Sequence, residues 1–268
     1  MLLALALSGY GMREALRVPP VREVRMQVPG LPDALNGFRI AQLSDLHIGP
    51  TFGKAWLTDV VARTDSLNPD LIVITGDVVD GSPSRLEEDV APLADLKAKY
   101  GVIFAPGNHE YYSGIQQWLP VFQRLGMHVL MNENTQIRVN GTPLAIAGVT
   151  DTAALNWGWK ALTPKRHSPA SPKTSPNSCS RTAPRSHRKA PRPGPRSSFP
   201  GTRTAALSCP SLPSSRRSTA AMSADPTPWT GSPSTSAAIG LWGGIPLRLF
   251  VPSEITLITL TGTGFDTN

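Results

Sequence analysis

Three short polar stretches in the first half of the chain carry residue types that bind divalent metal ions. They read SDLHIG, TGDVVD and APGNHE. Asp45 and His47 lie two positions apart in the first stretch, and Asp77 follows a glycine in the second. In the third, Asn108 and His109 follow a Pro-Gly pair. Carboxylate, amide and imidazole groups together suit Mn, Fe, Zn or Mg, and a carboxylate that bridges two such ions would help activate water for attack on phosphorus.

Each stretch also has an ordinary structural explanation. An aspartate at the end of a strand is commonly a turn former or a helix cap, and a single histidine beside a glycine is commonly structural. All three stretches occur in one order and at regular spacing, which argues against coincidence and favours the metal site.

The elements that must position these residues are visible in the surrounding pattern. Apolar runs typical of buried strands cover residues 38–45, 71–75 and 102–108, and helical patterns cover 55–70 and 84–101. Strands that alternate with helices predict a layered α/β fold. In such sheets ligand sites form beyond the carboxyl ends of the strands. Further strands are expected at residues 127–132, 144–151 and 253–261.

The motifs DLH, GDVVD and GNHE resemble the first three motifs of the calcineurin-like metallophosphoesterase superfamily. The flanks FRIAQLSDLHIGPTFG, PDLIVITGDVVDG and SEITLITL resemble its bacterial membrane-associated branch, and the resemblance covers roughly residues 19–157 and 239–260. It implies an α/β fold, built as a layered β-sandwich flanked by helices. It also implies a hydrolase that cleaves phosphate mono- or diesters with water activated by two divalent metal ions.

The resemblance further implies a role for each candidate residue. Asp45 and His47 would bind the first metal ion, and Asp77 would bridge both ions. Asn108 would bind the second ion, and His109 would assist the leaving group or stabilise charge. The residues that support these loops without binding metal would be Asp80, Gly107 and Glu110.

A segment of different composition interrupts this pattern. Residues 161–238 hold 12 of the 26 lysines and arginines, 14 of the 27 prolines and a single acid, Asp225. The net charge of +7 and the pI of about 9.8 arise here and do not describe the rest of the chain. Abundant Pro, Ser and charge predict disorder. Because few aromatic residues are interleaved for base stacking, we expect no nucleic-acid partner.

The same segment lacks the two later superfamily motifs, a histidine in an Ala-His-x-Pro context and GHTHGG, which supply three further metal ligands. Translated one base out of register, PGTRTAA (200–206) can decode as SGHTHGG and SRTAP (180–184) as LAHSP. One constant offset that recovers several motifs in order predicts a double frameshift across about residues 160–238. The printed sequence then keeps half of the metal site, and we expect its hydrolase activity to be impaired.

These observations divide the chain into four segments and leave several functions open. We expect a membrane-associated bacterial protein, with a cytoplasmic location as the alternative, whose substrate is a phosphate ester, lipid-linked or soluble. The competing functions are an inactive scaffold and a protein that binds polyanions through its basic segment. The sequence does not determine the oligomeric state.

The four segments are an apolar N-terminus (1–35), half of a phosphoesterase domain (36–159), the aberrant segment (160–238) and the C-terminal strands of that domain (239–268). The apolar N-terminus is either the remnant of a membrane anchor or a surface helix.

Overall fold

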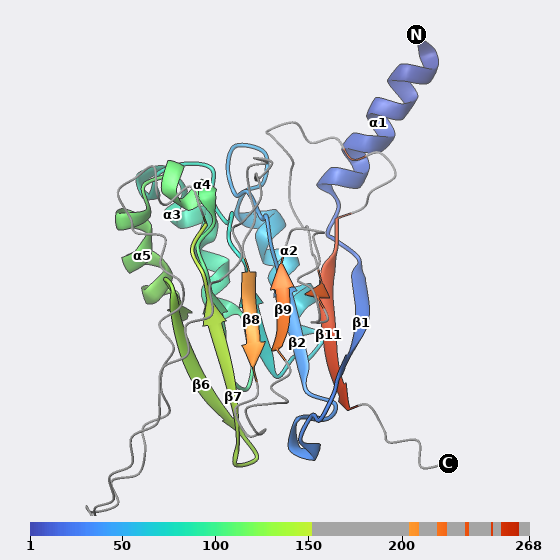
Figure 1. The fold of residues 1–268 in the computed structure, drawn as a ribbon. Coiled ribbons are helices and arrows are strands. Elements are labelled where there is room, and N and C mark those ends of the chain that lie inside the picture. The colour runs from blue at the N-terminus through green and yellow to red at the C-terminus, as the bar shows by residue number, and fades with distance from the viewer. Residues whose placement is uncertain (152–203, 209–218, 224–233, 236–247, 249–252, 263–268) are drawn as a thin grey trace, which may run out of the picture. The chain divides into compact units, whose positions relative to one another are not determined.

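The structure is a computed structural model, shown in Figure 1. It describes residues 1–151, 204–208, 219–223, 234–235, 248 and 253–262. All of these residues belong to one of two units in the chain, and the other unit, Arg166–Pro200, lies outside the described residues. The expectation of disorder between residues 160 and 238 therefore falls mostly outside them as well.

The candidate site is carried by a six-stranded sheet with the strand order β1-β11-β2-β3-β4-β5. Strands β2 to β5 run parallel to one another, whereas β11 pairs antiparallel with β2 and parallel with β1. The C-terminal strand thus lies between two N-terminal strands. Their bounds are β1 (Val21–Val28), β2 (Arg39–Leu43), β3 (Leu71–Ile74), β4 (Val102–Phe104), β5 (Met127–Val129) and β11 (Ile255–Gly262).

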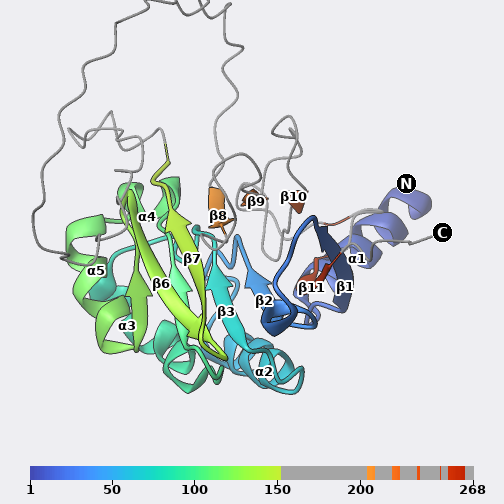
Figure 2. The same cartoon turned by 60° about the horizontal axis from the view of Figure 1, so that its bottom comes forward.

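Alternating side chains of these strands enter two separate apolar clusters, so the sheet is buried on both faces. Ile72 and Ile74 of β3 pack in a cluster with residues of the helices, whereas Leu71 and Val73 pack in a second cluster with residues of β7. This confirms the layered α/β fold, and Figure 2 shows the helices and the second sheet around the central strands. The helices among the described residues are α1 (Leu2–Leu16), α2 (Lys54–Asp65), α3 (Pro83–Val90), α4 (Asn108–Tyr112) and α5 (Ile115–Arg124), with short 3-10 turns η1 (Asp33–Leu35) and η2 (Ala91–Asp95).

A second sheet has the strand order β10-β9-β8-β7-β6, and three of its strands lie inside the segment that we expected to be disordered. Strand β8 pairs antiparallel with β7, and β9 pairs antiparallel with β8. Backbone pairing of this kind needs only an extended partner and not a particular side-chain pattern, which is why the composition gave no sign of it. The bounds are β6 (Glu133–Val139), β7 (Thr142–Gly148), β8 (Thr204–Ser208), β9 (Thr219–Ser223) and β10 (Ser234–Thr235).

The helix expected over residues 84–101 is shorter in the structure. Helix α3 ends at Val90, and the chain continues as the 3-10 turn η2. Pro92 lacks the N–H that an α-helical bond would need, and its ring crowds the preceding turn. The sequence pattern missed α5 altogether, although Trp118 of this helix is fully buried and its Nε1 donates to the Gly81 carbonyl at 2.9 Å.

The apolar N-terminus forms α1, whose last two turns pack on the domain. Gly11, Glu14 and Ala15 are buried there, and the Trp56 indole donates to the Arg17 carbonyl oxygen at 3.4 Å. Across the portion of the chain that the structure describes, no helix has both the length and the apolar character to cross a membrane.

Candidate metal centre

The loops that carry the candidate residues leave the same edge of the central sheet. Leu43, Ile74 and Phe104 are the last residues of three adjacent parallel strands and lie side by side in register. The first two loops continue to pair beyond the strands, because the Asp45 amide donates to the Gly76 carbonyl at 3.1 Å and the His47 amide to the Asp77 carbonyl at 2.9 Å. The polar residues that follow each strand are therefore brought together, as the sequence predicted.

Three candidate residues adopt the left-handed backbone conformation. The φ angles are 56° at Asp45, 47° at His47 and 54° at Asp77. A residue with a Cβ atom pays about 1 kcal/mol or more in this region, although Asp and His tolerate it better than most residues. Unfavourable backbone angles persist only where surrounding contacts impose them, and they gather at functional sites. Their concentration at this edge is a sign of function that sequence patterns do not reveal.

Glu110 supplies the contacts that hold two of these loops. Its side chain is fully buried, and its carboxylate accepts hydrogen bonds from the backbone amides of Asp77 (2.9 Å), Val78 (2.6 Å), Val79 (3.3 Å) and Gly107 (2.6 Å). One carboxylate thus joins the loop after β3 to the loop after β4. This agrees with the supporting role expected for Glu110.

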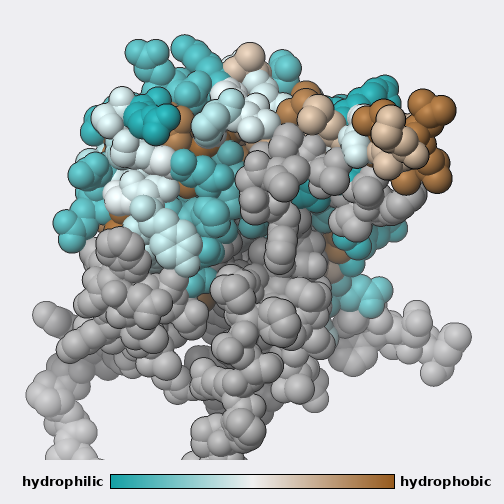
Figure 3. Space-filling model, turned by 90° about the horizontal axis from the view of Figure 1, so that it is seen from above, coloured by the Kyte–Doolittle hydropathy of each residue, from teal (hydrophilic) through white to brown (hydrophobic). Residues whose placement is uncertain are grey.

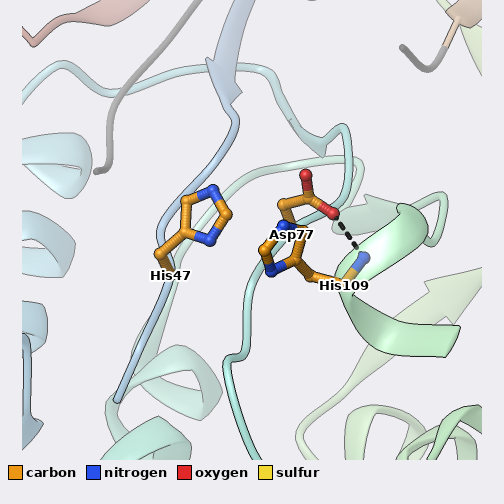
Figure 4. Close-up of side chains that lie close together, drawn as sticks. All are labelled: His47, Asp77 and His109. Atoms are coloured by element: carbon orange, nitrogen blue, oxygen red, sulfur yellow. Dashed lines mark hydrogen bonds between the residues drawn. The ribbon is translucent and has the colours of Figure 1, made fainter. Parts of the chain in front are cut away.

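His47, Asp77 and His109 form the group that could hold a metal ion among the described residues. One ligand atom from each lies within 4.8 Å of the others, and Figure 4 shows how the three side chains lie relative to one another. The backbone amide of His109 donates to the Asp77 carboxylate at 2.9 Å, which orients that carboxylate. His109, expected to assist the leaving group, thus belongs to the group of side chains that could hold a metal ion.

Asp80 contacts both histidines, a role that the sequence did not reveal. Its Oδ1 lies 3.0 Å from Nδ1 of His47 and 2.6 Å from Nδ1 of His109. Metal-binding histidines commonly present their second ring nitrogen to a carboxylate in this way, which fixes the ring and its tautomer. The three-residue spacing from Asp77 was the available signal, but it could not show that the Asp80 side chain lies between two imidazoles.

The electrostatics of this cluster follow from its partial burial. Burial lowers the pKa of His47, but its contacts with Asp45 and Asp80 outweigh burial and raise the pKa to about 10. Contact with Asp80 is the main cause of the raised pKa of His109. Burial raises the pKa of Asp80, yet its two histidine partners hold it well below the usual range. A metal ion that binds His47 would therefore have to displace a proton.

The remaining two candidates lie at the border of this group. Asp45 Oδ1 is 3.8 Å from Nε2 of His47, and its other carboxylate oxygen accepts a hydrogen bond from the Ser44 hydroxyl. Asn108 is half-buried as the first residue of α4. The charge of Asp45 also acts on Arg248, whose pKa is lowered by burial and partly restored by Asp45 and Glu254. The sequence pattern had not singled out Arg248.

A pocket of about 480 Å³ opens over the cluster. Its lining includes His47, Asp80 and His109, together with the exposed ring of Tyr112. The pocket is therefore reached from solvent, and a ligand in it would contact the residues most suited to bind a metal ion.

The sequence that builds this site is similar to that of known proteins. Residues 38–165 match the profile of the calcineurin-like phosphoesterases. This region of the chain belongs to that family. The chain is 36% identical over 158 residues to a zebrafish (Danio rerio) protein named "Transmembrane protein with metallophosphoesterase domain", and the match covers 58% of this chain and 36% of the relative. An uncharacterized metallophosphoesterase of Campylobacter jejuni is 32% identical over 157 residues, 58% of this chain and 40% of that protein.

A third relative is similar over a larger share of its own length. It is an uncharacterized metallophosphoesterase of Aquifex aeolicus, 31% identical over 163 residues, which are 61% of this chain and 60% of that protein. The chain spans about a third of the length of the relatives from Danio rerio and Bos taurus.

Proposed function

We propose that the chain hydrolyses phosphate mono- or diesters with water activated by two divalent metal ions, drawn from Mn, Fe, Zn and Mg. The observation that carries the proposal is the convergence of His47, Asp77 and His109 at one sheet edge, within a region that belongs to the phosphoesterase family. Asp45 and His47 would hold the first ion, Asp77 both ions, and Asn108 the second. When bound, the ions would lower the pKa of a water molecule and offset charge on the phosphate.

The donor set fits such ions. Carboxylate oxygens and imidazole nitrogens suit this group of metals. Because Asp80 lies at Nδ1 of His47, the Nε2 atom is left to face Asp45 at 3.8 Å. That separation is shorter than twice a metal–ligand bond of about 2.1 Å, so both atoms could bind one ion.

The remaining residues would orient the substrate and supply a proton to its leaving oxygen. His109 lines the pocket, and its ring is held by Asp80. We assign it the contact with the leaving oxygen, where an imidazolium can donate a proton. Glu110 keeps Asp77 and the start of α4 in place through the backbone.

We further propose that residues 36–159 and 239–268 build one phosphoesterase domain, preceded by the apolar N-terminus (1–35) and interrupted by the segment 160–238. The position of β11 between β1 and β2 supports this division. Since the printed segment lacks the later histidine motifs, we propose that a frameshift reduces the activity of the chain as printed.

The proposed function is tested by hydrolysis of bis(para-nitrophenyl) phosphate by the purified chain. We expect a chelator to remove turnover and Mn²⁺ to restore it. We also expect Asp77→Asn to lower turnover at least about tenfold, because the bridging carboxylate is lost. Asp59→Asn, at an exposed position of α2, is the matched control. Hydrolysis that survives both the chelator and Asp77→Asn would contradict the proposal.

Replacing Asp80 by asparagine is expected to weaken Mn²⁺ binding about 10- to 100-fold, the usual effect of losing a carboxylate that orients a histidine ligand. The amide keeps the size of the side chain but not the charge that holds the rings of His47 and His109. Isothermal titration with Mn²⁺ measures the change, with Asp59→Asn as the control. Unchanged affinity would mean that Asp80 does not orient the ligands.

A further inference from the structure

Helix α1 presents an apolar surface that the domain does not cover. The exposed fractions are 84% for Leu2, 73% for Leu3 and 62% for Leu5. From Leu2 to Met12 the helix carries no charged residue. Figure 3, which looks down on the edge of the molecule from which α1 projects, shows these residues as an apolar group at one side. Other exposed apolar side chains of the helix are Leu7, Tyr10, Met12 and Leu16.

Basic residues gather where this apolar run ends. The side chains of Arg13 and Arg17 are 80% and 43% exposed. Arg22 of β1 is 61% exposed, and its guanidinium lies 3.3 Å from the Glu254 carboxylate. Glu14 is only 11% exposed and lies 2.9 Å from Arg17, so the charge that this turn shows to solvent is positive. Guanidinium groups at the border of an apolar run complement anionic lipid headgroups, because the aliphatic stem stays in the apolar layer and the charge reaches the phosphates.

The dimensions of the apolar run fit a lipid layer. A helix rises about 1.5 Å per residue, so the run from Leu2 to Met12 extends about 16 Å. An apolar run of this length can reach well into the roughly 30 Å hydrocarbon core of a bilayer. The run is apolar all round and has no polar face of its own, which favours entry into the lipid over lying flat on a protein surface.

The topology brings α1 to the same edge of the sheet as the metal centre. Strand β1 starts at Val21, a few residues after α1, and runs parallel to β11. Strand β11 runs antiparallel to β2, so the start of β1 lies at the edge where β2, β3 and β4 end. Figure 1 shows α1 projecting from this edge. Arg248 joins the two, because its amide donates to the Gly11 carbonyl at 2.9 Å and its charge interacts with Asp45.

We propose that α1 enters the surface of an anionic lipid bilayer and turns the metal-centre edge toward the headgroups, so that phosphate esters of membrane lipids are the substrates. The second half of this proposal rests on the proposed function. The insertion of α1 does not, because it depends on exposure and charge alone.

The insertion is tested by flotation of the full chain with vesicles of phosphatidylcholine and phosphatidylglycerol. We expect the chain to float, and the double variant Leu3→Glu/Leu5→Glu to reduce the vesicle-bound fraction at least about tenfold, because charged side chains are costly in hydrocarbon. The matched control, Gln116→Glu/Gln123→Glu, adds two charges to exposed positions of α5 and should float like the parent.

Other occupants of the surface give different results. If flotation is unchanged in the α1 variant but is removed by high salt, the basic segment 161–238 binds the vesicles and the proposal is overturned. If the parent is a dimer by light scattering and the α1 variant is a monomer that floats equally well, a second copy covers the helix, which also overturns it.

The orientation of the domain on the bilayer is measured with a fluorophore attached to a single introduced cysteine. The two native cysteines are first removed by Cys179→Ser/Cys209→Ser. Ser84→Cys lies on the metal-centre side of the sheet after β3, and Asp33→Cys lies at the opposite edge between β1 and β2. Energy transfer to acceptor-labelled headgroups should be strong from position 84 and weak from position 33. Equal or reversed transfer would overturn the orientation.

The substrate class is tested by comparing phosphate release from vesicle lipids with hydrolysis of the soluble nitrophenyl ester. We expect Leu3→Glu/Leu5→Glu to lower the first at least about tenfold and to leave the second unchanged. Hydrolysis of the soluble ester alone by the parent chain would overturn the lipid substrate. If neither substrate is hydrolysed, the proposed function fails and the lipid substrate with it, while the flotation result still decides whether α1 inserts.

Discussion

Replacing Glu110 by alanine is expected to lower the free energy of unfolding by about 3–5 kcal/mol. The carboxylate accepts hydrogen bonds from four backbone amides in a fully buried position. Each buried donor left without a partner costs about 1–3 kcal/mol, although water entering the space would recover some of this. The loss falls at the upper end of single-substitution effects because one side chain serves two loops. Urea denaturation followed by circular dichroism measures it.

Two further variants make this prediction specific. Glu110→Gln keeps the size of the side chain, but its NH₂ group meets amide donors with another donor, so we expect a loss intermediate between the parent and Glu110→Ala. Glu88→Ala, at an exposed position of α3, should change the free energy by no more than about 0.5 kcal/mol. If Glu110→Ala unfolds at the same urea concentration as Glu88→Ala, the carboxylate does not hold the loops.

Restoring the proposed reading frame is expected to raise metal-dependent hydrolysis at least about a hundredfold over the chain as printed. The change is one base added near codon 160 and two near codon 238. In that frame PGTRTAA (200–206) can decode as SGHTHGG, which would supply histidine ligands that the printed chain lacks. Turnover of bis(para-nitrophenyl) phosphate with Mn²⁺ measures the gain.

The control for this experiment adds the same bases together with Asp77→Asn. Because the proposed bridging carboxylate would be needed in either frame, the turnover of this variant should be at least about tenfold lower than that of the restored chain. Resequencing the gene across codons 155–242 gives an independent check. If the printed chain already turns over as fast as the restored one, the frameshift proposal is wrong.

Much of the central sheet could be predicted because its strands are buried on both faces. The run 71–75 is almost continuously apolar, and the runs 38–45 and 102–108 carry apolar residues that the sheet buries; they appear as β3, β2 and β4. The residues after them lie at one edge, since parallel neighbours place their carboxyl ends together. The half-exposed strands β1 and β6 were missed, because their mixed side chains do not separate them from loops.

The sequence by itself determined which chemical groups are present and in what order they reach the sheet edge. Asp45, His47, Asp77, Asn108 and His109 are identifiable because metal chemistry restricts the residue types and strand ends restrict their places.

Only the tertiary structure decided how these groups meet. It put Asp80 between two imidazoles, made Glu110 the acceptor for amides of two loops, and brought α1 to the edge that carries the candidate metal centre. Apart from the local bond between Gly107 and Glu110, these contacts join residues about 30 positions apart, and they depend on strand order and loop direction. Local sequence patterns carry no record of either, because periodicity reports which face of an element is buried and not which other element covers it.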